Sequence, residues 1–486
     1  MEDWWLKYAY LQSRDSLVFS SNFGGNWITH SNLKLTLQGH EDHKRATSMA
    51  AVLAQVCNFW QMLRYEKIPP FQDSQGKKYT MHQFRNFFNT TRIPGTGQDN
   101  LSINFKTAKE GQCPNHIVVL YKGQFFTFIP FTNEGSTCHQ DDIVQALLEI
   151  ENNAEKVPSI GAVSCQDRDL WSHHYEILAK DNPETVKAIN EAICMIILSD
   201  FEPDNDSEQL KNCLLNDYAD IWADKSLIFM AFKNGLITSQ SEHSPFDGMV
   251  SGEVCGACLM GLMKSKKTEN TTNHKIIVEK LDLKIPDETL AIIPECQAKL
   301  ESRGNDLLLE YHHYPGYGKA RLKQLRMHPD AYVQVMIQAA VYKTHDKCLA
   351  TYETATTRQF YHGRTETVRS CTQEAMDFAI AINKETIDKT ELKKLLANAI
   401  TKHLELMEQC KNNHGCDRHL LGLKILALEN GMALPELFTD PAYKLSGGDG
   451  NFSMSTSLCG YSEVTGGCPP MVYDGYGVFY GIPNDK

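Results

Sequence analysis

The sequence lacks any apolar stretch that could cross a membrane as a helix: its longest apolar run, AICMIIL at 192–198, is far shorter than the ~20 residues required. It also lacks an excess of positive charge, because the formal net charge at pH 7 is −12. That balance disfavours a general nucleic-acid binder, and an anionic ligand would need a local basic patch. Internal repeats and low-complexity tracts are missing as well. The length of 486 residues predicts two to four domains, since one domain takes roughly 100–200 residues.

A regular cysteine pattern is missing too, although fifteen cysteines are present. An odd number of scattered cysteines indicates reduced thiols in an intracellular compartment. The CxxC motif from Cys255 to Cys258 is followed by no second pair with zinc-ligand spacing, so buried small side chains are favoured there over a metal site. The opening MEDWWLKYAY is acidic and aromatic, unlike a signal or transit peptide. We therefore expect a soluble chain without a metal.

Hydrophobic spacing predicts a mixture of helices and strands. Apolar positions at helical spacing predict a helix within 40–64, and NHIVVLYKGQFFTFIPF at 115–131 predicts two strands around a Lys-Gly turn. A second hairpin is predicted over 226–248 with its turn at Lys233-Asn234-Gly235, because Asn-Gly is a strong hairpin signal. Further long helices are predicted over 331–345, 390–410 and 417–430.

Polar segments suggest where the domains divide. The stretches at 265–275 and 280–290 predict a surface connection, and we place a domain boundary near Pro286. This gives an N-terminal domain over 1–285 and a C-terminal domain over 286–486. Because strands and helices alternate throughout, we expect an α/β (α+β) fold with two domains.

The stretch SEHSPFDGMV at 241–250 places a histidine and an aspartate four residues apart. Pro245 and Gly248 make a regular helix unfavourable here, so the stretch predicts a tight loop that directs the imidazole of His243 outward. Such a histidine can act as a general base near neutral pH. The alternative is an ordinary loop histidine whose ring is satisfied by its neighbours. The pattern His-x-x-x-Asp-Gly resembles the active-site motif of CoA-dependent acyltransferases that share the chloramphenicol acetyltransferase fold.

A basic cluster stands out in this acidic chain. YGKARLKQLRMHPDAY at 317–332 carries Lys319, Arg321, Lys323 and Arg326, and no acidic residue intervenes before Asp330. Lys319 and Lys323 are four residues apart, so they would share one face of a helix. They could then bind a phosphate as point charges. The alternative is a solvated, basic helix end.

Three further stretches complete a recognisable set: YETATTRQFYHGRTETVRS at 352–370, CDRHLLGLK at 416–424 and SMSTSLCGY at 453–461. With the histidine and lysine stretches, and in the same order, they resemble the carnitine/choline acyltransferase family from DWWLKYAYLQ at 3–12 to DGYGVFY at 474–480. HSPFDG and the C-terminal TGGCPPMVYDGYG look most like the octanoyltransferases of that family. DWWLKYAYLQ and the LQG that ends at Gly39 look more like its acetyltransferases.

The resemblance implies two similar domains of the chloramphenicol acetyltransferase fold, with an active-site tunnel between them. It implies reversible transfer of a medium-chain acyl group between CoA and carnitine, with acyl-CoA and carnitine as the substrates of a monomer that needs no cofactor. His243 matches the catalytic histidine, which would deprotonate the carnitine hydroxyl or the CoA thiol. Ser457 matches the hydroxyl that stabilises the oxyanion. Asp247 would orient the imidazole or brace the loop through an ion pair.

The resemblance also implies a set of substrate-binding residues. The carnitine carboxylate would be held by Tyr352, Thr365 and Arg418, with Ser455 close by, and a planar guanidinium suits a carboxylate physically. The CoA 3′-phosphate would meet Lys319 and Lys323, and its adenine end would lie near Asp330. Gly466 falls where acetyl-specific members of the family place a methionine, so it would open an acyl pocket.

Each of these matches has a plainer alternative. Tyr352 can be an ordinary strand aromatic, and Thr365 a turn residue beside a glycine. Arg418 can pair at the surface with Asp417 or Glu429, and Ser455–Ser457 can be a polar strand edge. Gly466 and Gly467 can simply shape a turn or bulge.

The chain departs from the family at both ends, where helices before DWWLKYAY and a strand and helix after GYGVFYGIPNDK have no counterpart. Two alternatives to a medium-chain enzyme stay open. The acetyltransferase-like opening allows a short-chain carnitine acetyltransferase, and the missing ends allow a truncated, catalytically impaired fragment that binds CoA or carnitine. The resemblance implies a peroxisomal or mitochondrial location, although the ending Asn484-Asp485-Lys486 is no Ser-Lys-Leu type signal.

Overall fold

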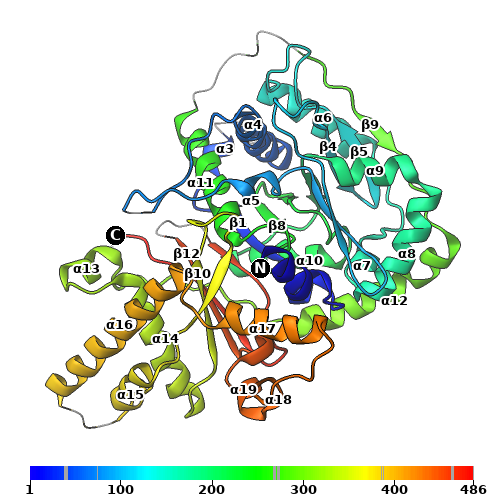
Figure 1. The fold of residues 1–486 in the computed structure, drawn as a ribbon. Coiled ribbons are helices and arrows are strands. Elements are labelled where there is room, and N and C mark those ends of the chain that lie inside the picture. Colours follow the sequence, from blue (N-terminus) through cyan, green and yellow to red (C-terminus); the bar gives the residue numbers. More distant parts are fainter. Residues whose placement is uncertain are drawn as a thin grey trace. The chain divides into compact units, whose positions relative to one another are not determined.

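A computed structural model describes residues 1–37, 42–73, 75–265, 270, 274–384, 386, 388–460 and 465–484 (Figure 1). The chain divides into two compact units. The larger unit contains residues 6–71 and 81–311, and the smaller unit contains residues 1–5, 72–80 and 312–486. Both units mix strands with helices, which confirms the predicted α/β class.

The larger unit is built on a mixed sheet. Its strands run in the order β1 (Phe23–Ile28), β8 (Ile237–Ser241), β7 (Ile228–Phe232), β6 (Met195–Ser199), β4 (Ile117–Tyr121), β5 (Gln124–Phe128) and β9 (Glu279–Leu281). The central strands β4, β6 and β7 pair in parallel, whereas the outer pairs are antiparallel. A separate antiparallel hairpin joins β2 (Thr90–Ile93) to β3 (Asn100–Ile103).

Helices surround this sheet. They are the π-helix η1 (Leu6–Leu11), α2 (Leu17–Ser20), α3 (Lys34–Leu37), α4 (Lys44–Arg64), α5 (His82–Arg85), α6 (Gln140–Asn153), α7 (Gly161–Ser164), α8 (Arg168–Asp181), α9 (Pro183–Glu191), α10 (Asp206–Leu215), the 3₁₀ turn η2 (Asn216–Tyr218), α11 (Gly248–Lys264) and α12 (Asp287–Asp306). The helix predicted within 40–64 is confirmed as α4, although 38–41 lie outside the described residues. Within the described residues, no helix combines the length and the apolar character that a membrane crossing requires.

One hydrophobic cluster of the larger unit lies on one face of the sheet, whose central strands are buried on both faces. Val118, Met195 and Ile228 are register partners on adjacent parallel strands, so their side chains share that face. Trp171 of α8 and Trp222 pack against each other in the same cluster, with ring centroids 5.6 Å apart. All five are buried and apolar, and the hydrophobic effect therefore supplies the main stabilisation of this unit.

Both hairpins predicted from turn chemistry are confirmed. β4 and β5 are joined by Lys122 and Gly123 at φ 53° and 79°, the left-handed values that a two-residue hairpin turn requires. β7 and β8 are joined through Gly235 at φ 92°. An added Cβ at Gly123 would lie 2.5 Å from the carbonyl oxygen of Val157, so only glycine fits this turn.

The segment near Pro286 is more ordered than a surface connection. The edge strand β9 overlaps the start of 280–290, and α12 begins at Asp287. Ile293 and Leu300 of α12 belong to the core of the larger unit, which explains why the chain passes between the two units at 311–312. The assignment of substrate-binding roles to a C-terminal domain stays a prediction.

The smaller unit contains a four-stranded sheet in the order β11 (Thr365–Arg369), β10 (Thr351–Thr356), β12 (Met454–Gly460) and β14 (Tyr476–Gly481). Its other elements are α1 (Glu2–Trp5), α13 (Lys319–Gln324), α14 (Pro329–His345), α15 (Gln373–Ile382), α16 (Lys389–Lys411), α17 (Asp417–Glu429), α18 (Glu436–Thr439), α19 (Pro441–Leu445), the turn η3 (Gly448–Gly450) and β13 (Thr465–Gly467). The three long helices predicted in this half are confirmed as α14, α16 and α17. In Figure 1, α14, α15 and α16 lie beside one another, and α16 packs on β10 and β11.

Lys225 is a fully buried amine just before β7 in the larger unit. Its Nζ donates hydrogen bonds to the carbonyl of Asn190 at 2.8 Å and to Oγ1 of Thr91 at 3.2 Å. Burial lowers the pKa of this amine to about 7, because an ammonium loses its hydration there.

We expect Lys225 to make the free energy of unfolding rise with pH above neutrality. In the unfolded chain a lysine keeps its proton up to a pKa of ~10.4, so the unfolded state binds more protons than the folded state in this window. Lys225→Met should remove the contribution. The urea concentration at the midpoint of unfolding should therefore rise more for the wild type than for the variant between pH 7 and 9. A difference in midpoint that does not change with pH would contradict the assignment.

Candidate functional site

His243 lies in the loop that joins β8 to α11, as the sequence predicted. β8 ends at Ser241, α11 begins at Gly248, and the imidazole is half-buried. Its Nδ1 lies 3.0 Å from the carbonyl oxygen of Phe246. A carbonyl can only accept a hydrogen bond, so we assign the ring proton to Nδ1. The lone pair then resides on Nε2, which is the arrangement that a general base needs.

Two aromatic residues that sequence reasoning missed enclose this imidazole. The hydroxyl of Tyr10 on η1 lies 3.4 Å from Nδ1, and the two ring centroids are 5.4 Å apart. Phe23 on β1 meets the imidazole edge-on, with centroids 4.9 Å apart. Tyr10 belongs to the stretch DWWLKYAYLQ, which the sequence analysis singled out for its resemblance alone. These contacts limit the rotation of the imidazole. The aromatic rings of Tyr10 and Phe23 also cover part of its surface.

Asp247 is buried at the end of the same loop, with 7% of its surface exposed. Its backbone N–H donates to Oε1 of Gln83 on α5 at 2.8 Å, which ties the loop to another element of the unit. The role predicted for its carboxylate, in orienting His243 or bracing the loop, stays a prediction.

In the smaller unit, the sheet register brings the candidate carnitine residues onto one face. Tyr352 on β10 is the register partner of Ser455 on the parallel strand β12. Side chains alternate along a strand, so Ser457 points to the same side as Ser455. Thr365 on β11 pairs with Thr356, an even number of positions from Tyr352, and therefore lies on that face too.

Arg418 at the start of α17 reaches the Thr365 end of this face. Its Nη2 donates to Oγ1 of Thr365 at 3.2 Å, and its Nε donates to the carbonyl of Thr365 at 3.1 Å. The guanidinium carbon lies 3.6 Å from the ring centroid of Trp5, a cation–π contact that the sequence did not reveal. Asp417, proposed as a surface partner, is instead bound in bidentate fashion by Arg369 at 2.7 and 2.9 Å.

The opposite face of the sheet carries a buried polar layer that includes Asp330. The hydroxyl of Tyr480 donates to Oδ1 of Asp330 at 2.6 Å and accepts from Nε2 of Gln334 at 2.8 Å. Gln334 also donates to Oγ1 of Thr456 at 3.0 Å. Asp330 is only 6% exposed, so its bonds lie within the protein. A role for it at the adenine end of CoA stays a prediction.

The same layer contains ligand types that could bind a metal. Among the described residues, Asp330, Glu353 and His403 place ligand atoms within 4.8 Å of one another, and all three are buried. His403 Nε2 lies 2.7 Å from Oε2 of Glu353. Burial alone would lower the pKa of His403, but the hydrogen bond to Glu353 and its charge raise it. Burial raises the pKa of Glu353 as well, so we describe His403 and Glu353 as a buried hydrogen-bonded pair beside Asp330.

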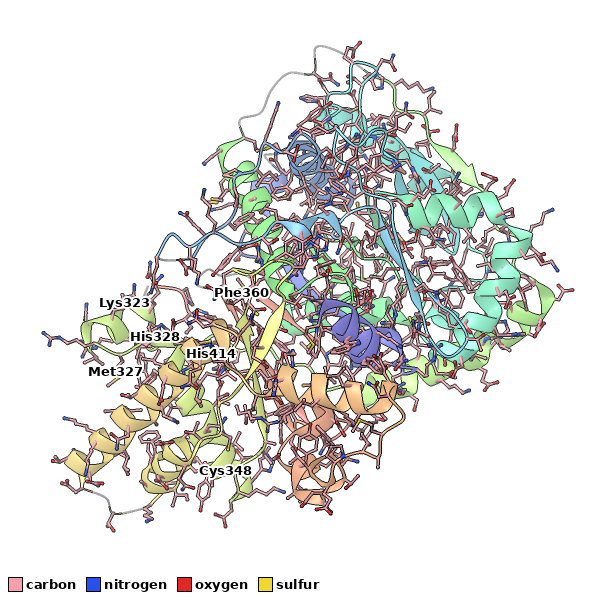
Figure 2. The ribbon with its side chains drawn as sticks, viewed as in Figure 1. Lys323, Met327, His328, Cys348, Phe360 and His414 are labelled. Atoms are coloured by element: carbon pink, nitrogen blue, oxygen red, sulfur yellow. The ribbon has the colours of Figure 1, made fainter. Side chains whose placement is uncertain are left out.

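The candidate CoA lysines lie together on α13. Lys319 and Lys323 are one helical turn apart, Lys319 is half-buried and Lys323 is exposed. Lys323 can be followed in Figure 2, where Met327 and His328 mark the turn into α14. Arg321 lies between the lysines on a different side of the helix and donates to Gln324 at 3.2 Å. One face of α13 therefore presents two ammonium groups.

Gly466, the candidate acyl-pocket residue, lies in the short strand β13. Its carbonyl oxygen accepts a weak hydrogen bond from Sγ of Cys459 at 3.9 Å. The residues between Gly460 and β13 lie outside the described part of the chain. Gly466 and Gly467 are strand residues and do not themselves form a turn, and the alternative that the glycine pair shapes a bulge stays a prediction.

The chain is similar to known proteins over its whole length. Residues 1–486 match the family model described as Choline/Carnitine o-acyltransferase. Peroxisomal carnitine O-octanoyltransferase of Bos taurus is 34% identical over 100% of this chain and 81% of its own length, and that of Homo sapiens is 33% identical with the same coverage. Carnitine O-acetyltransferase of Mus musculus is 28% identical over 99% of this chain and 77% of its own length.

Proposed function

Because the chain belongs to the choline/carnitine O-acyltransferase family, we propose that it transfers an acyl group reversibly between the thiol of CoA and the hydroxyl of carnitine. The observation that supports this best is the setting of His243, where the 3.0 Å contact of Nδ1 with the Phe246 carbonyl leaves Nε2 as the basic nitrogen. Nε2 removes the proton of the carnitine hydroxyl as that oxygen attacks the thioester carbonyl. The C–S bond of the thioester then breaks, the departing CoA sulfur takes the proton from Nε2, and the acyl group has passed directly from one substrate to the other. In the reverse direction Nε2 removes the thiol proton.

The remaining residues have binding roles in this proposal. The hydroxyl of Ser457 donates to the oxyanion that forms at the thioester carbon, which is where a preorganised donor lowers the barrier. Arg418 and Thr365 hold the carnitine carboxylate, with Tyr352 and Ser455 on the same sheet face. Their support is the hydrogen-bonded Arg418–Thr365 pair, which fixes the guanidinium fork.

CoA and the compartment complete the proposal. Lys319 and Lys323 on one face of α13 bind the 3′-phosphate of CoA, and Asp330 lies near the adenine end of CoA. Acyl-CoA and carnitine are the substrates, and neither a resident cofactor, a nucleic acid nor a second subunit takes part. Relatives named as peroxisomal support the peroxisome as the location, with the mitochondrion as the alternative.

The proposal is tested by incubating the purified chain with acyl-CoA and carnitine and measuring acylcarnitine. Choline in place of carnitine is the control substrate, because it lacks the carboxylate that Arg418 would bind. A chain that binds CoA or carnitine without forming acylcarnitine would be the catalytically impaired binding protein instead. Equal rates with choline and carnitine would contradict the carboxylate site.

We further propose that medium-chain acyl groups are preferred over acetyl. The support is Gly466, which adds no side chain to β13, together with relatives named octanoyltransferases at higher identity than the acetyltransferases. Each CH₂ buried in an apolar channel contributes about 0.8 kcal/mol at most, so the preference should grow over several carbons.

Gly466→Met should reverse this preference, because a long side chain would fill the path of the acyl tail. We expect octanoyl transfer to fall at least roughly tenfold, since about two lost methylenes of burial are worth that factor, while acetyl transfer is spared. Gly467→Met is the matched control, as it adds the same side chain on the other face of β13. Initial rates with acetyl-CoA and octanoyl-CoA measure both. A wild type that prefers acetyl-CoA would disprove the pocket assignment.

A further inference from the structure

A chain of buried ion pairs in the larger unit ends at the loop that carries His243. It runs from Asp224 to Arg168 at 2.7 Å, from Arg168 to Asp99 at 2.7 Å, from Asp99 to Arg92 at 2.7 Å and from Arg92 to Glu242 at 3.1 Å. Every one of these side chains is at most 1% exposed. Buried charges are costly unless they are paired, so the position of each group is fixed by its partner.

Glu242 connects this chain to the residues on both sides of the imidazole. Its Oε1 accepts from Nη1 of Arg92 and from the backbone N–H of Ser244, each at 3.1 Å. Its Oε2 accepts from the hydroxyl of Ser244. The residues before and after His243 are therefore tied to one carboxylate, and that carboxylate is held by Arg92. The backbone of His243 can move only if these bonds break.

Arg92 holds a second segment that contacts the same imidazole. Its Nη2 donates to the carbonyl of Tyr10 at 2.8 Å, and the hydroxyl of Tyr10 lies 3.4 Å from Nδ1 of His243. The guanidinium of Arg92 thus holds the histidine loop through Glu242. It also holds the backbone of Tyr10, whose side chain contacts the imidazole. Removing Arg92 would leave the buried Glu242 without its charged partner near His243, and removing Glu242 would leave Arg92 paired with Asp99 alone.

We propose that Arg92 and Glu242 are positioning residues for His243, which hold its ring in the productive orientation and balance the charge beside it. The inference rests on the proposed function, because it assigns His243 as the base. The titratable and charged groups around the imidazole are Tyr10 from η1, Asp247 at the start of α11, and the Arg92–Glu242 pair, with Asp99 behind Arg92. Arg92 and Glu242 carry opposite charges, so their removal should have opposite effects on the base.

The test compares Glu242→Gln and Arg92→Gln across the pH profile of kcat/KM for acyl transfer. Both should lower kcat roughly ten- to a hundredfold, because a small misplacement of a reacting group costs that much, and the KM values for carnitine and acyl-CoA should change less than about twofold. Glu242→Gln leaves an excess positive charge that disfavours the imidazolium, so the acid limb should move to lower pH. Arg92→Gln leaves an excess negative charge and should move it to higher pH.

Two further variants complete the design. Arg92→Lys keeps the charge, so it should return the acid limb to the wild-type position while recovering only part of kcat, since an ammonium cannot reproduce the guanidinium fork. Arg14→Gln is the matched control. The side chain of Arg14 is 22% exposed and donates its hydrogen bonds to Asp99, Asp169 and Gly95, so its loss should leave the acid limb in place.

The outcomes separate the inference from the proposed function. Opposite shifts of the acid limb support the positioning pair, whereas variants that lose stability with an unmoved acid limb would show a purely structural pair and overturn it. If either glutamine variant fails to fold, Ser244→Ala removes one hydroxyl without changing charge. It should lower kcat several-fold at unchanged KM, and an unchanged kcat would also overturn the inference. Retained transfer in His243→Ala would instead refute the proposed function.

Discussion

His243→Ala is expected to abolish acyl transfer while CoA binding persists. The imidazole is the group that takes the proton in the proposed reaction, and general base catalysis contributes ~10²–10⁴ in rate before the loss of orientation is added. The candidate CoA lysines lie on α13 of the other unit, so the variant should still bind CoA with its normal affinity. Acylcarnitine formation measures the first effect and calorimetric titration with CoA measures the second.

A second variant separates the role of His243 as a base from its structural role in the loop. His243→Asn keeps a short donor that can reach the carbonyl of Phe246, which now accepts from Nδ1 at 3.0 Å, but it has no basic nitrogen. It should fold like the wild type and remain inactive. Substantial turnover in either variant would reject His243 as the base.

Arg418→Asn is expected to raise the KM for carnitine by roughly ten- to a hundredfold. A hydrogen bond to a charged group is worth about 1.5–3 kcal/mol, and the variant removes the guanidinium that would bind the carboxylate. The rate at saturating carnitine should fall much less, because the carboxylate is remote from the reacting hydroxyl. Steady-state kinetics with carnitine as the varied substrate gives both values.

Lys424→Asn provides the matched control for Arg418. Lys424 lies on the same helix, α17, and pairs with Asp449 at 2.6 Å, so its replacement removes one positive charge from α17 without touching Thr365. It should leave the KM for carnitine unchanged. An equal rise in both variants would mean that net charge, rather than a specific contact, governs binding.

Local features were predictable from the sequence because they depend on neighbouring residues. The Asn234-Gly235 turn and the loop containing Pro245 each follow from backbone preferences over a few positions. His243 was accordingly found in the loop where the sequence placed it.

Partners that are distant in the sequence could not be predicted. Arg92 is a charged residue that composition alone would place on the surface, and only the fold brings it to Glu242 and Asp99. Trp5 reaches Arg418 from the other end of the chain for the same reason. The regular structure near Pro286 was not predicted because the stretch is mostly polar. Only a few apolar residues, such as Ile293, pack α12 against the core.

The alternation of side chains along β12 predicts how the protein responds to insertions and deletions before this strand. Ser455 and Ser457 point to one side, and Thr456 points to the other, where it donates to the carbonyl of Tyr352 and accepts from Gln334. Adding or removing one residue in the turn η3 that leads into β12 would slide the strand and exchange these sides. The serines would then meet the buried helices, and Thr456 would replace them. A change of one residue in the length of this turn should therefore abolish activity, whereas a substitution in the turn should lower activity only in part.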